Sequence, residues 1–258
     1  MSVVMIIWSI IIGLITGSVT SLIGASGVSI VVPALTLFFG INSHIAIGSS
    51  LLVDVITSII VSVSYFKHHN VRLAASLWIA VGSILGSQLG SHWAGLIPDG
   101  ALDVTFAIVL LISGISTLRR GGKVFDSSKG LHFDSKVLQD LSLVVLGFLI
   151  GIISGLVGAG GGVMVLLTII FILHYPMHEA VGTSTFIMCI TALSSLIGYA
   201  RQGNVDWKLG LIIAAGAVIA GAIGAKFANE INETKLSKIV SWIFIVLSIM
   251  MVAVHLVH

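Results

Sequence analysis

Residues 44–66 read HIAIGSSLLVDVITSIIVSVSYF, and Asp54 is the only Asp, Glu, Lys or Arg among them. The stretch has the length that a helix needs to cross about 30 Å of hydrocarbon. A second stretch, residues 178–200, reads HEAVGTSTFIMCITALSSLIGYA, and its apolar segment is 179–200. It matches the first stretch in two rare residues, His and Tyr. Neither stretch alternates strictly between apolar and polar residues, as a half-buried strand would. The two stretches therefore predict a pair of related membrane helices.

The rest of the chain has the same apolar character. Its 258 residues are 57% hydrophobic and only 9% charged, whereas a soluble domain carries about 25% charged residues. This composition excludes a soluble enzyme, a nucleic-acid-binding protein and a disordered chain, and predicts an all-α polytopic membrane protein. Cys189 is the only cysteine, so we expect no disulfide within the chain. We also expect no metal, cofactor or catalytic residue. The other apolar segments are 3–23, 28–41, 74–97, 101–118, 141–157, 162–174, 208–229 and 236–257.

An internal repeat relates the two halves of the chain. A constant offset of 134 residues aligns 14–102 with 148–236 without a gap. His44, Tyr65 and the pair Asn70-Val71 then fall on His178, Tyr199 and Asn204-Val205. Because His, Tyr and Asn are rare in this chain, shared membrane composition does not explain their coincidence. We therefore expect a first repeat at 1–118, a polar cytoplasmic linker at 119–139 and a second repeat at 140–258.

The number of membrane crossings depends on the two short segments, 28–41 and 162–174. Lys and Arg residues concentrate in the linker, which predicts that the linker lies in the cytoplasm. If the short segments cross, each half has five crossings, the halves are inverted, and there are ten segments. If they are re-entrant, each half has four crossings, the halves are parallel, and there are eight. We favour five plus five, with short broken helices, because both termini lack Lys and Arg and the turn Gly40–Ser43 leaves little chain for a return path.

Two glycine-rich junctions precede the short segments at equivalent positions. Glycine exposes backbone N–H groups, and the helix that follows begins with unpaired N–H groups and a positive dipole end. Such a junction can hold an anion without a buried cation. A tight turn that allows close helix packing is the alternative. The candidate binding residues are Gly24, Ala25, Ser26, Gly27, Gly158, Gly160, Gly161 and Gly162.

Small hydroxyl residues begin the long helices that follow. They are Ser49 and Ser50 in the first half, and Thr183, Ser184 and Thr185 in the second. Their hydroxyl groups can donate to the oxygens of an anion along a pathway, or they can bind neighbouring helices.

Several titratable residues are candidates for coupling or for attracting the anion. Asp54 lies well inside an apolar helix, where a carboxylate is costly and usually functional, so it is a candidate for proton coupling. The alternative is a protonated carboxyl group that hydrogen bonds Ser50 or Ser58. His44 and His178 are candidate proton carriers or residues at the helix entry. Lys67 and Arg201 can attract anions into a vestibule or anchor their helices at the interface.

The doubled glycine motif, the H-x-A-x-G-[ST]-S stretch after it and the Asn-Val turn resemble the sulfite exporter TauE/SafE family. The resemblance covers nearly the whole chain. It implies a multi-pass permease of the bacterial cytoplasmic (inner) membrane for sulfite or an organosulfonate. Each half departs from the family pattern of a glycine run followed by a proline. The first half keeps Pro33 but has Ser26 within the run, and the second keeps Gly160–Gly162 but has Leu167 in place of proline.

The expected function is a secondary transporter or facilitator that moves a small anion by alternating access. Its partners are the lipid bilayer, the anion and, through Asp54, the proton. An anion channel is the second hypothesis, and a membrane-embedded enzyme or an assembly factor is the third. The sequence leaves the direction of transport, the exact anion and the oligomeric state open.

Overall fold

The computed structural model describes residues 3–93, 111, 115, 118, 136–157 and 162–257. The described residues form helices and turns without a strand, which confirms the predicted all-α class. In chain order the helices are α1 (Val3–Ile23), α2 (Val28–Phe39), α3 (Ser43–Lys67), α4 (Leu73–Trp93), α6 (Lys136–Val157), α7 (Gly162–Phe171), α8 (Met177–Arg201), α9 (Trp207–Glu230) and α10 (Glu233–Val257).

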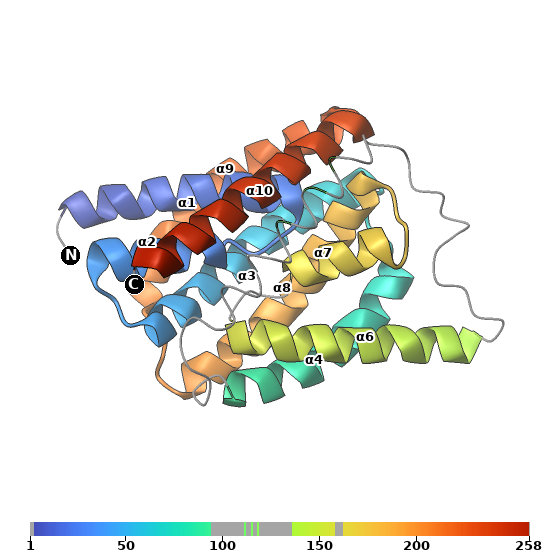
Figure 1. The fold of residues 1–258 in the computed structure, drawn as a ribbon, viewed down its shortest axis with the longest axis horizontal. Helices are drawn as coiled ribbons and strands as arrows, with labels where there is room; N and C mark the ends of the chain where they lie inside the picture. Colours follow the sequence, from blue (N-terminus) through green and yellow to red (C-terminus); the bar gives the residue numbers. More distant parts are fainter. Residues whose placement is uncertain are drawn as a thin grey trace.

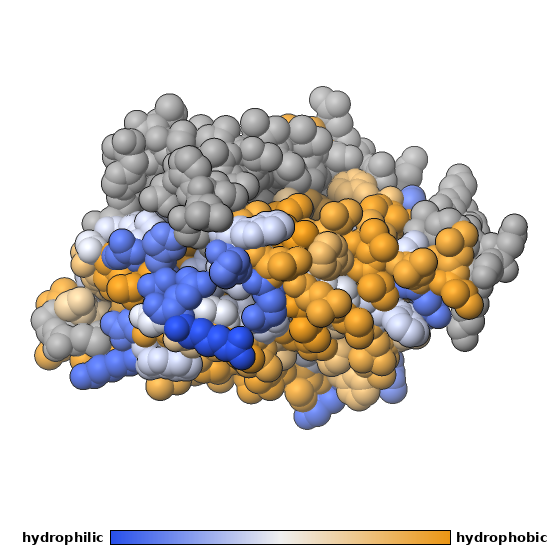
Figure 2. Space-filling model, turned by 90° about the horizontal axis from the view of Figure 1, so that it is seen from below, coloured by the Kyte–Doolittle hydropathy of each residue, from blue (hydrophilic) through white to orange (hydrophobic). Residues whose placement is uncertain are grey.

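Six of the described helices are long and apolar enough to cross a membrane: α1, α3, α4, α6, α8 and α9. Many large apolar side chains on their outer faces are exposed, as lipid-facing residues are. Figure 2 shows one face of the molecule, on which apolar side chains cover a broad area and hydrophilic side chains gather toward one end. The chain is a multi-pass membrane protein.

The observed helix bounds lie close to the apolar segments, with two differences. The first difference is at α6, which begins at Lys136, so residues 136–139 of the expected linker belong to a helix. Polar residues in the first turn can extend a membrane helix into the interface, where hydropathy no longer marks it. The second is that both short helices end before their apolar segments do. The expected segment 101–118, except for residues 111, 115 and 118, and the rest of the linker lie outside the described residues.

Two pairs of helices pack at very short distance through glycine. In the pair α1 and α9, a Cβ added to Gly13 would lie 2.0 Å from the carbonyl oxygen of Ile213. In the pair α4 and α6, a Cβ added to Gly147 would lie 2.1 Å from the carbonyl oxygen of Ile79. Glycine is the residue that permits such an approach between membrane helices. The two contacts are equivalent, because the offset of 134 relates Gly13 to Gly147 and Ile79 to Ile213. Figure 1 shows the two pairs on opposite sides of the molecule.

The long helices α3 and α8 lie between these pairs and are the most buried of the six. They run antiparallel, because Gly48 of α3 meets Asn204 beyond the end of α8, while Gly182 near the start of α8 meets Tyr65 near the end of α3. α9 runs parallel to α3, since Gly210 lies against Ser49 and Gly221 against Thr57.

α4 runs parallel to α8 in the other half of the molecule. Hydrogen bonds join Ser83 to Thr191 at 2.7 Å and Ser87 to Ser194 at 2.9 Å. The central helices are thus each covered by a helix from the other half of the sequence (Figure 1).

The short helices α2 and α7 lie against α3 and α8 respectively. Gly40 caps the end of α2. It adopts φ 64°, and its N–H donates to the carbonyl groups of Leu35 and Thr36. Only glycine adopts this left-handed conformation at little cost. Asn42 then caps α3 by accepting a hydrogen bond from the N–H of His44 at 2.9 Å.

Candidate functional site

The first glycine-rich junction lies against Gly162, the described residue of the second junction, inside the molecule. A Cβ added to Gly162 would lie 2.8 Å from the Cα of Ala25 and 2.9 Å from the backbone N of Ser26. The described junction residues are all buried: Gly24, Ala25, Ser26, Gly27 and Gly162. Gly158, Gly160 and Gly161 lie outside the described residues. The first junction and Gly162 of the second therefore lie together in one buried region where α2 and α7 begin.

Asp54 of α3 extends its carboxylate to the start of α2. One oxygen accepts a hydrogen bond from the backbone N–H of Gly27 at 2.9 Å, and the other accepts one from the hydroxyl of Ser26. The Ser26 hydroxyl also accepts a hydrogen bond from the N–H of Val28 at 3.1 Å. Asp54 is 1% exposed. The partners are thus Ser26 and Gly27 rather than the expected Ser50 or Ser58, because those two hydroxyls bond carbonyl groups of their own helix.

Met188 occupies the corresponding position in the second half. The offset of 134 relates it to Asp54, and its sulfur would lie 2.6 Å from a Cβ added to Gly162. The first junction therefore has a carboxylate beside it, and the second has a thioether.

Two of the predicted hydroxyl residues, Ser184 and Thr185, lie beside the first junction. The Ser184 hydroxyl donates to the carbonyl oxygen of Gly24 and to that of Val181, at 3.0 Å in each case. The Thr185 hydroxyl donates to the carbonyl of Val181 at 2.7 Å, and that of Ser50 to the carbonyl of Ile47 at 2.8 Å. Ser184 and Thr185 face Gly24, since a Cβ there would lie 2.4 Å and 3.0 Å from their oxygens.

The hydroxyls of Ser49 and Thr183 lie instead at the turns of the opposite half. The Ser49 hydroxyl accepts a hydrogen bond from the N–H of Asp206 at 2.9 Å. The Thr183 hydroxyl accepts one from the N–H of Arg72 at 3.0 Å. Because 72 and 206 also differ by 134, the two contacts are equivalent.

The neighbouring glycines make the same cross-half contact. A Cβ at Gly48 would lie 1.8 Å from the carbonyl oxygen of Asn204, and one at Gly182 would lie 2.1 Å from that of Asn70. In each half, the glycine and the hydroxyl residue after it in the H-x-A-x-G-[ST]-S motif thus contact the Asn-Val turn of the other half or the residue just after it. This packing accounts for the pairing of the two motifs along the chain.

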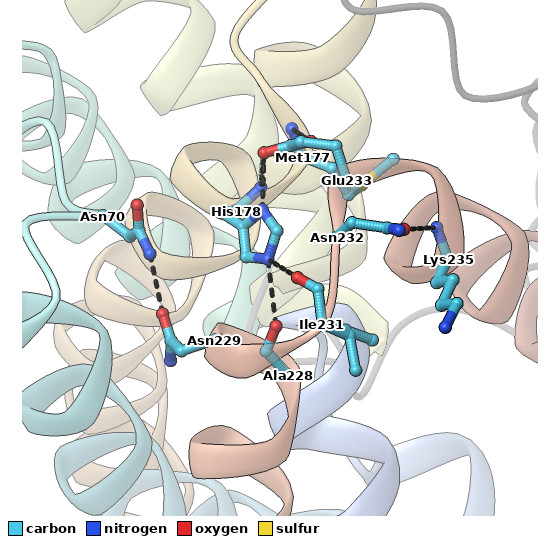
Figure 3. Close-up of polar contacts among 9 residues, drawn as sticks. All are labelled: Asn70, Met177, His178, Ala228, Asn229, Ile231, Asn232, Glu233 and Lys235. Atoms are coloured by element: carbon cyan, nitrogen blue, oxygen red, sulfur yellow. Dashed lines mark hydrogen bonds and ion pairs between the residues drawn. The ribbon is translucent and has the colours of Figure 1, made fainter.

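His178 ties the start of α8 to the turn between α9 and α10 (Figure 3). Its Nδ1 lies 2.5 Å from the Glu233 carboxylate, and its Nε2 lies 3.0 Å from the carbonyl oxygens of both Ala228 and Ile231. Glu233 also accepts a hydrogen bond from the N–H of Met177 at 2.8 Å. Figure 3 shows Asn70 and Asn229 joined nearby, at 2.7 Å. His44, the equivalent of His178, is half-buried at the start of α3.

An ion pair that the sequence analysis missed joins the two halves. Arg72 donates two hydrogen bonds to the carboxylate of Glu179, at 2.7 Å and 3.0 Å, and its guanidinium lies 5.7 Å from the centre of the Tyr175 ring. These hydrogen bonds raise the pKa of the Arg72 guanidinium, so the side chain keeps its charge at physiological pH. No sequence signal joins residues 107 positions apart. The predicted vestibule residues Lys67 and Arg201 are exposed at the ends of α3 and α8.

The described residues contain no group of three or more His, Cys, Asp or Glu side chains arranged to hold a metal ion. The buried region thus offers backbone amides, hydroxyl groups and one carboxylate.

A family profile described as "Sulfite exporter TauE/SafE" matches residues 9–251. The chain belongs to the TauE/SafE family. It is similar to the "Probable membrane transporter protein YunE" of Bacillus subtilis, with 27% identity over 88% of this chain and 89% of the relative. It is also similar to the "Probable membrane transporter protein MJ0441" of Methanocaldococcus jannaschii, with 29% identity over 94% of this chain and 93% of the relative. No solved structure matches the chain.

These findings confirm the family resemblance drawn from the doubled motifs. The chain is a membrane transporter of the TauE/SafE family and not an enzyme.

Proposed function

We propose that this transporter carries a small sulfur-containing anion, sulfite or an organosulfonate, that binds where the two junctions meet. The observation that supports this most strongly is the Asp54 carboxylate that Ser26 and Gly27 hold at the first junction. A sulfonate or sulfite group presents negatively charged oxygens of the same kind to the same donors.

The proposed binding residues come from both halves. They are Gly24, Ala25, Ser26, Gly27, Gly158, Gly160, Gly161 and Gly162 at the junctions, with Ser50, Ser184 and Thr185 nearby. In this proposal Ser49 and Thr183 hold the Asn-Val turns and do not bind the anion, because their hydroxyls already accept backbone N–H groups there.

We also propose that the halves are repeats of inverted topology, with five crossings each. The bounds of α3, Ser43–Lys67, become those of α8 when 134 is added. The antiparallel course of α3 and α8, and the paired contacts at the same offset, support this arrangement. An inverted pair can present its shared site to one side of the membrane and then to the other. The proposed location is the bacterial cytoplasmic membrane, with the linker inside.

The burial of the site favours a carrier over an open channel. Every described junction residue is buried, so an anion enters only when the halves move relative to each other. A carrier saturates and turns over slowly compared with a channel.

Flux measurements in proteoliposomes test the proposal. We expect saturable uptake of radiolabelled sulfite that unlabelled methanesulfonate or sulfoacetate reduces by competition. Gly161→Val should abolish uptake while the folded protein remains in the membrane, and protein-free liposomes set the background. Absence of uptake for every sulfur anion would contradict the substrate class, and near-normal flux in Gly161→Val would contradict the site.

A further inference from the structure

Asp54 acts as an internal ligand of the first junction. It is the twelfth residue of the 25-residue helix α3, so it lies near the middle of the bilayer. Its two carboxylate oxygens take the N–H of Gly27, which caps α2, and the hydroxyl of Ser26. An incoming anion at this junction needs these same two donors, and it cannot share them with a charged Asp54.

Two buried hydroxyl groups beside this carboxylate have unused hydrogen-bonding capacity. Thr16 of α1 and Thr57 of α3 are 0% exposed, and neither hydroxyl has a partner among the described residues. The Thr16 side chain lies directly against Gly27, because a Cβ there would be 2.0 Å from its methyl carbon. Thr57 lies one turn from Asp54 on the same helix. Buried polar groups are normally paired, so these two hydroxyls point to a ligand that is bound in another state.

No other charged group of the described residues lies at this depth. α1 and α2 carry no titratable side chain, and the titratable group in the middle of α8 is the Cys189 thiol, which lies near Ser58 of α3. The remaining titratable residues of α3, α8 and α9 are confined to their terminal turns: His44, Tyr65, Lys67, His178, Glu179, Tyr199, Arg201, Lys208, Lys226 and Glu230.

We propose that Asp54 and the transported anion alternate on the donors of Ser26 and Gly27, so that each singly charged anion travels with one proton in the same direction. This inference rests on the proposed function. A proton from the aqueous side binds one carboxylate oxygen of Asp54, which then releases the Gly27 N–H and the Ser26 hydroxyl. The anion takes both donors and the hydroxyls of Thr16 and Thr57. On the other side the anion leaves, the proton dissociates and the carboxylate returns.

The proposal makes the transport of a monovalent anion electroneutral. Before the anion binds, the negative charge at the junction is that of the Asp54 carboxylate. After it binds, the negative charge is that of the anion, and the proton on Asp54 keeps the total charge of the site unchanged. The second half binds no proton at the equivalent position, because the residue there is Met188.

The experiment measures uptake of radiolabelled methanesulfonate, and in parallel sulfite, into proteoliposomes free of Na⁺. Methanesulfonate keeps a single negative charge over the whole working range of pH, so a pH effect on its uptake belongs to the protein. We expect an inward proton gradient to raise initial uptake at least about fivefold. A potassium diffusion potential should leave methanesulfonate uptake unchanged.

Variants assign the proton to Asp54. Asp54→Asn should bind and exchange the anion without a response to the pH gradient. Asp140→Asn, which removes the same charge in the second turn of α6, should keep the full response. Should Asp54→Asn fail to reach the membrane, Thr16→Val and Thr57→Val keep the side-chain shape, and we expect each to raise the KM about tenfold with the proton response intact.

The outcomes separate this inference from the proposed function. If the wild type carries neither probe, with or without added Na⁺, the proposed function fails. Proton–anion alternation at Asp54 is wrong if the wild type carries a probe without a response to the proton gradient, or if its uptake requires Na⁺. It is also wrong if the Asp54→Asn variant still responds to the pH gradient. Unchanged KM in both threonine variants also contradicts it.

Discussion

At the scale of single residues, two pairs of glycines meet different physical demands. Gly48 and Gly182 lie against the carbonyl oxygens of Asn204 and Asn70, so they lack a side chain because there is no room for one. Gly40 and Gly203 adopt φ 64° and 74° with nothing within 4 Å of an added Cβ, so backbone conformation alone favours glycine there. The doubled H-x-A-x-G-[ST]-S stretch contains Gly48 and Gly182, but the sequence did not identify the carbonyl groups that require them.

This difference predicts unequal costs for one substitution. Gly48→Ala should destabilise the protein by at least about 2 kcal/mol, because the new methyl group would lie 1.8 Å from a backbone oxygen that cannot move alone. Gly203→Ala should cost about 1 kcal/mol, from left-handed strain only. Thermal unfolding midpoints of the purified proteins in detergent check this, and equal midpoints for the two variants would contradict the contact.

At the scale of helices and turns, hydropathy predicted the elements well because lipid imposes length and composition on each span. It also predicted that α2 and α7 are short. It did not predict the first turn of α6, whose polar residues resemble a linker. The role of Ser49 and Thr183 could not be read from one chain, because a hydroxyl in the first two turns of a helix serves a ligand or a neighbouring turn equally well. The partners of Asp54 were missed for a similar reason, since Ser26 and Gly27 lie in a different helix junction 27 to 28 residues away.

A pair of alanine variants tests the turn contact. Ser49→Ala leaves the N–H of Asp206, just before α9, without its acceptor, which should cost about 1–3 kcal/mol. Ser50→Ala removes a hydroxyl that bonds only within α3 and should change the stability by less than about 1 kcal/mol. We expect the flux per folded Ser49→Ala molecule to stay near that of the wild type. A normal thermal midpoint combined with lost flux would instead identify Ser49 as a ligand of the anion.

At the scale of the whole molecule, the two halves are interlocked rather than adjacent. Helices α1, α3 and α9 run in one direction, and α4, α6 and α8 run in the other, as their glycine and hydroxyl contacts show. The ion pair between Arg72 and Glu179 joins the halves at the end where α4 and α8 begin. At the equivalent positions, Asp206 and Ile45 cannot form such a pair. The repeat predicted related helices, but it did not predict that each half would cover the central helix of the other, because side-chain packing between segments leaves no periodic trace in the sequence.

The antiparallel course of α3 and α8 leads to a topology that can be measured directly. Lys67 ends α3 and Arg201 ends α8, and both are exposed. In a background of Cys189→Ala, we expect Lys67→Cys to react with a membrane-impermeant maleimide only after the cells are permeabilised, so that the reagent reaches the cytoplasmic face. Arg201→Cys should react in intact cells, because inverted halves place equivalent residues on opposite sides. Permeabilised cells, in which both cysteines should react, provide the control. Labelling of both cysteines from the same side would mean parallel halves with four crossings each, and would remove the basis for alternating access by inverted repeats.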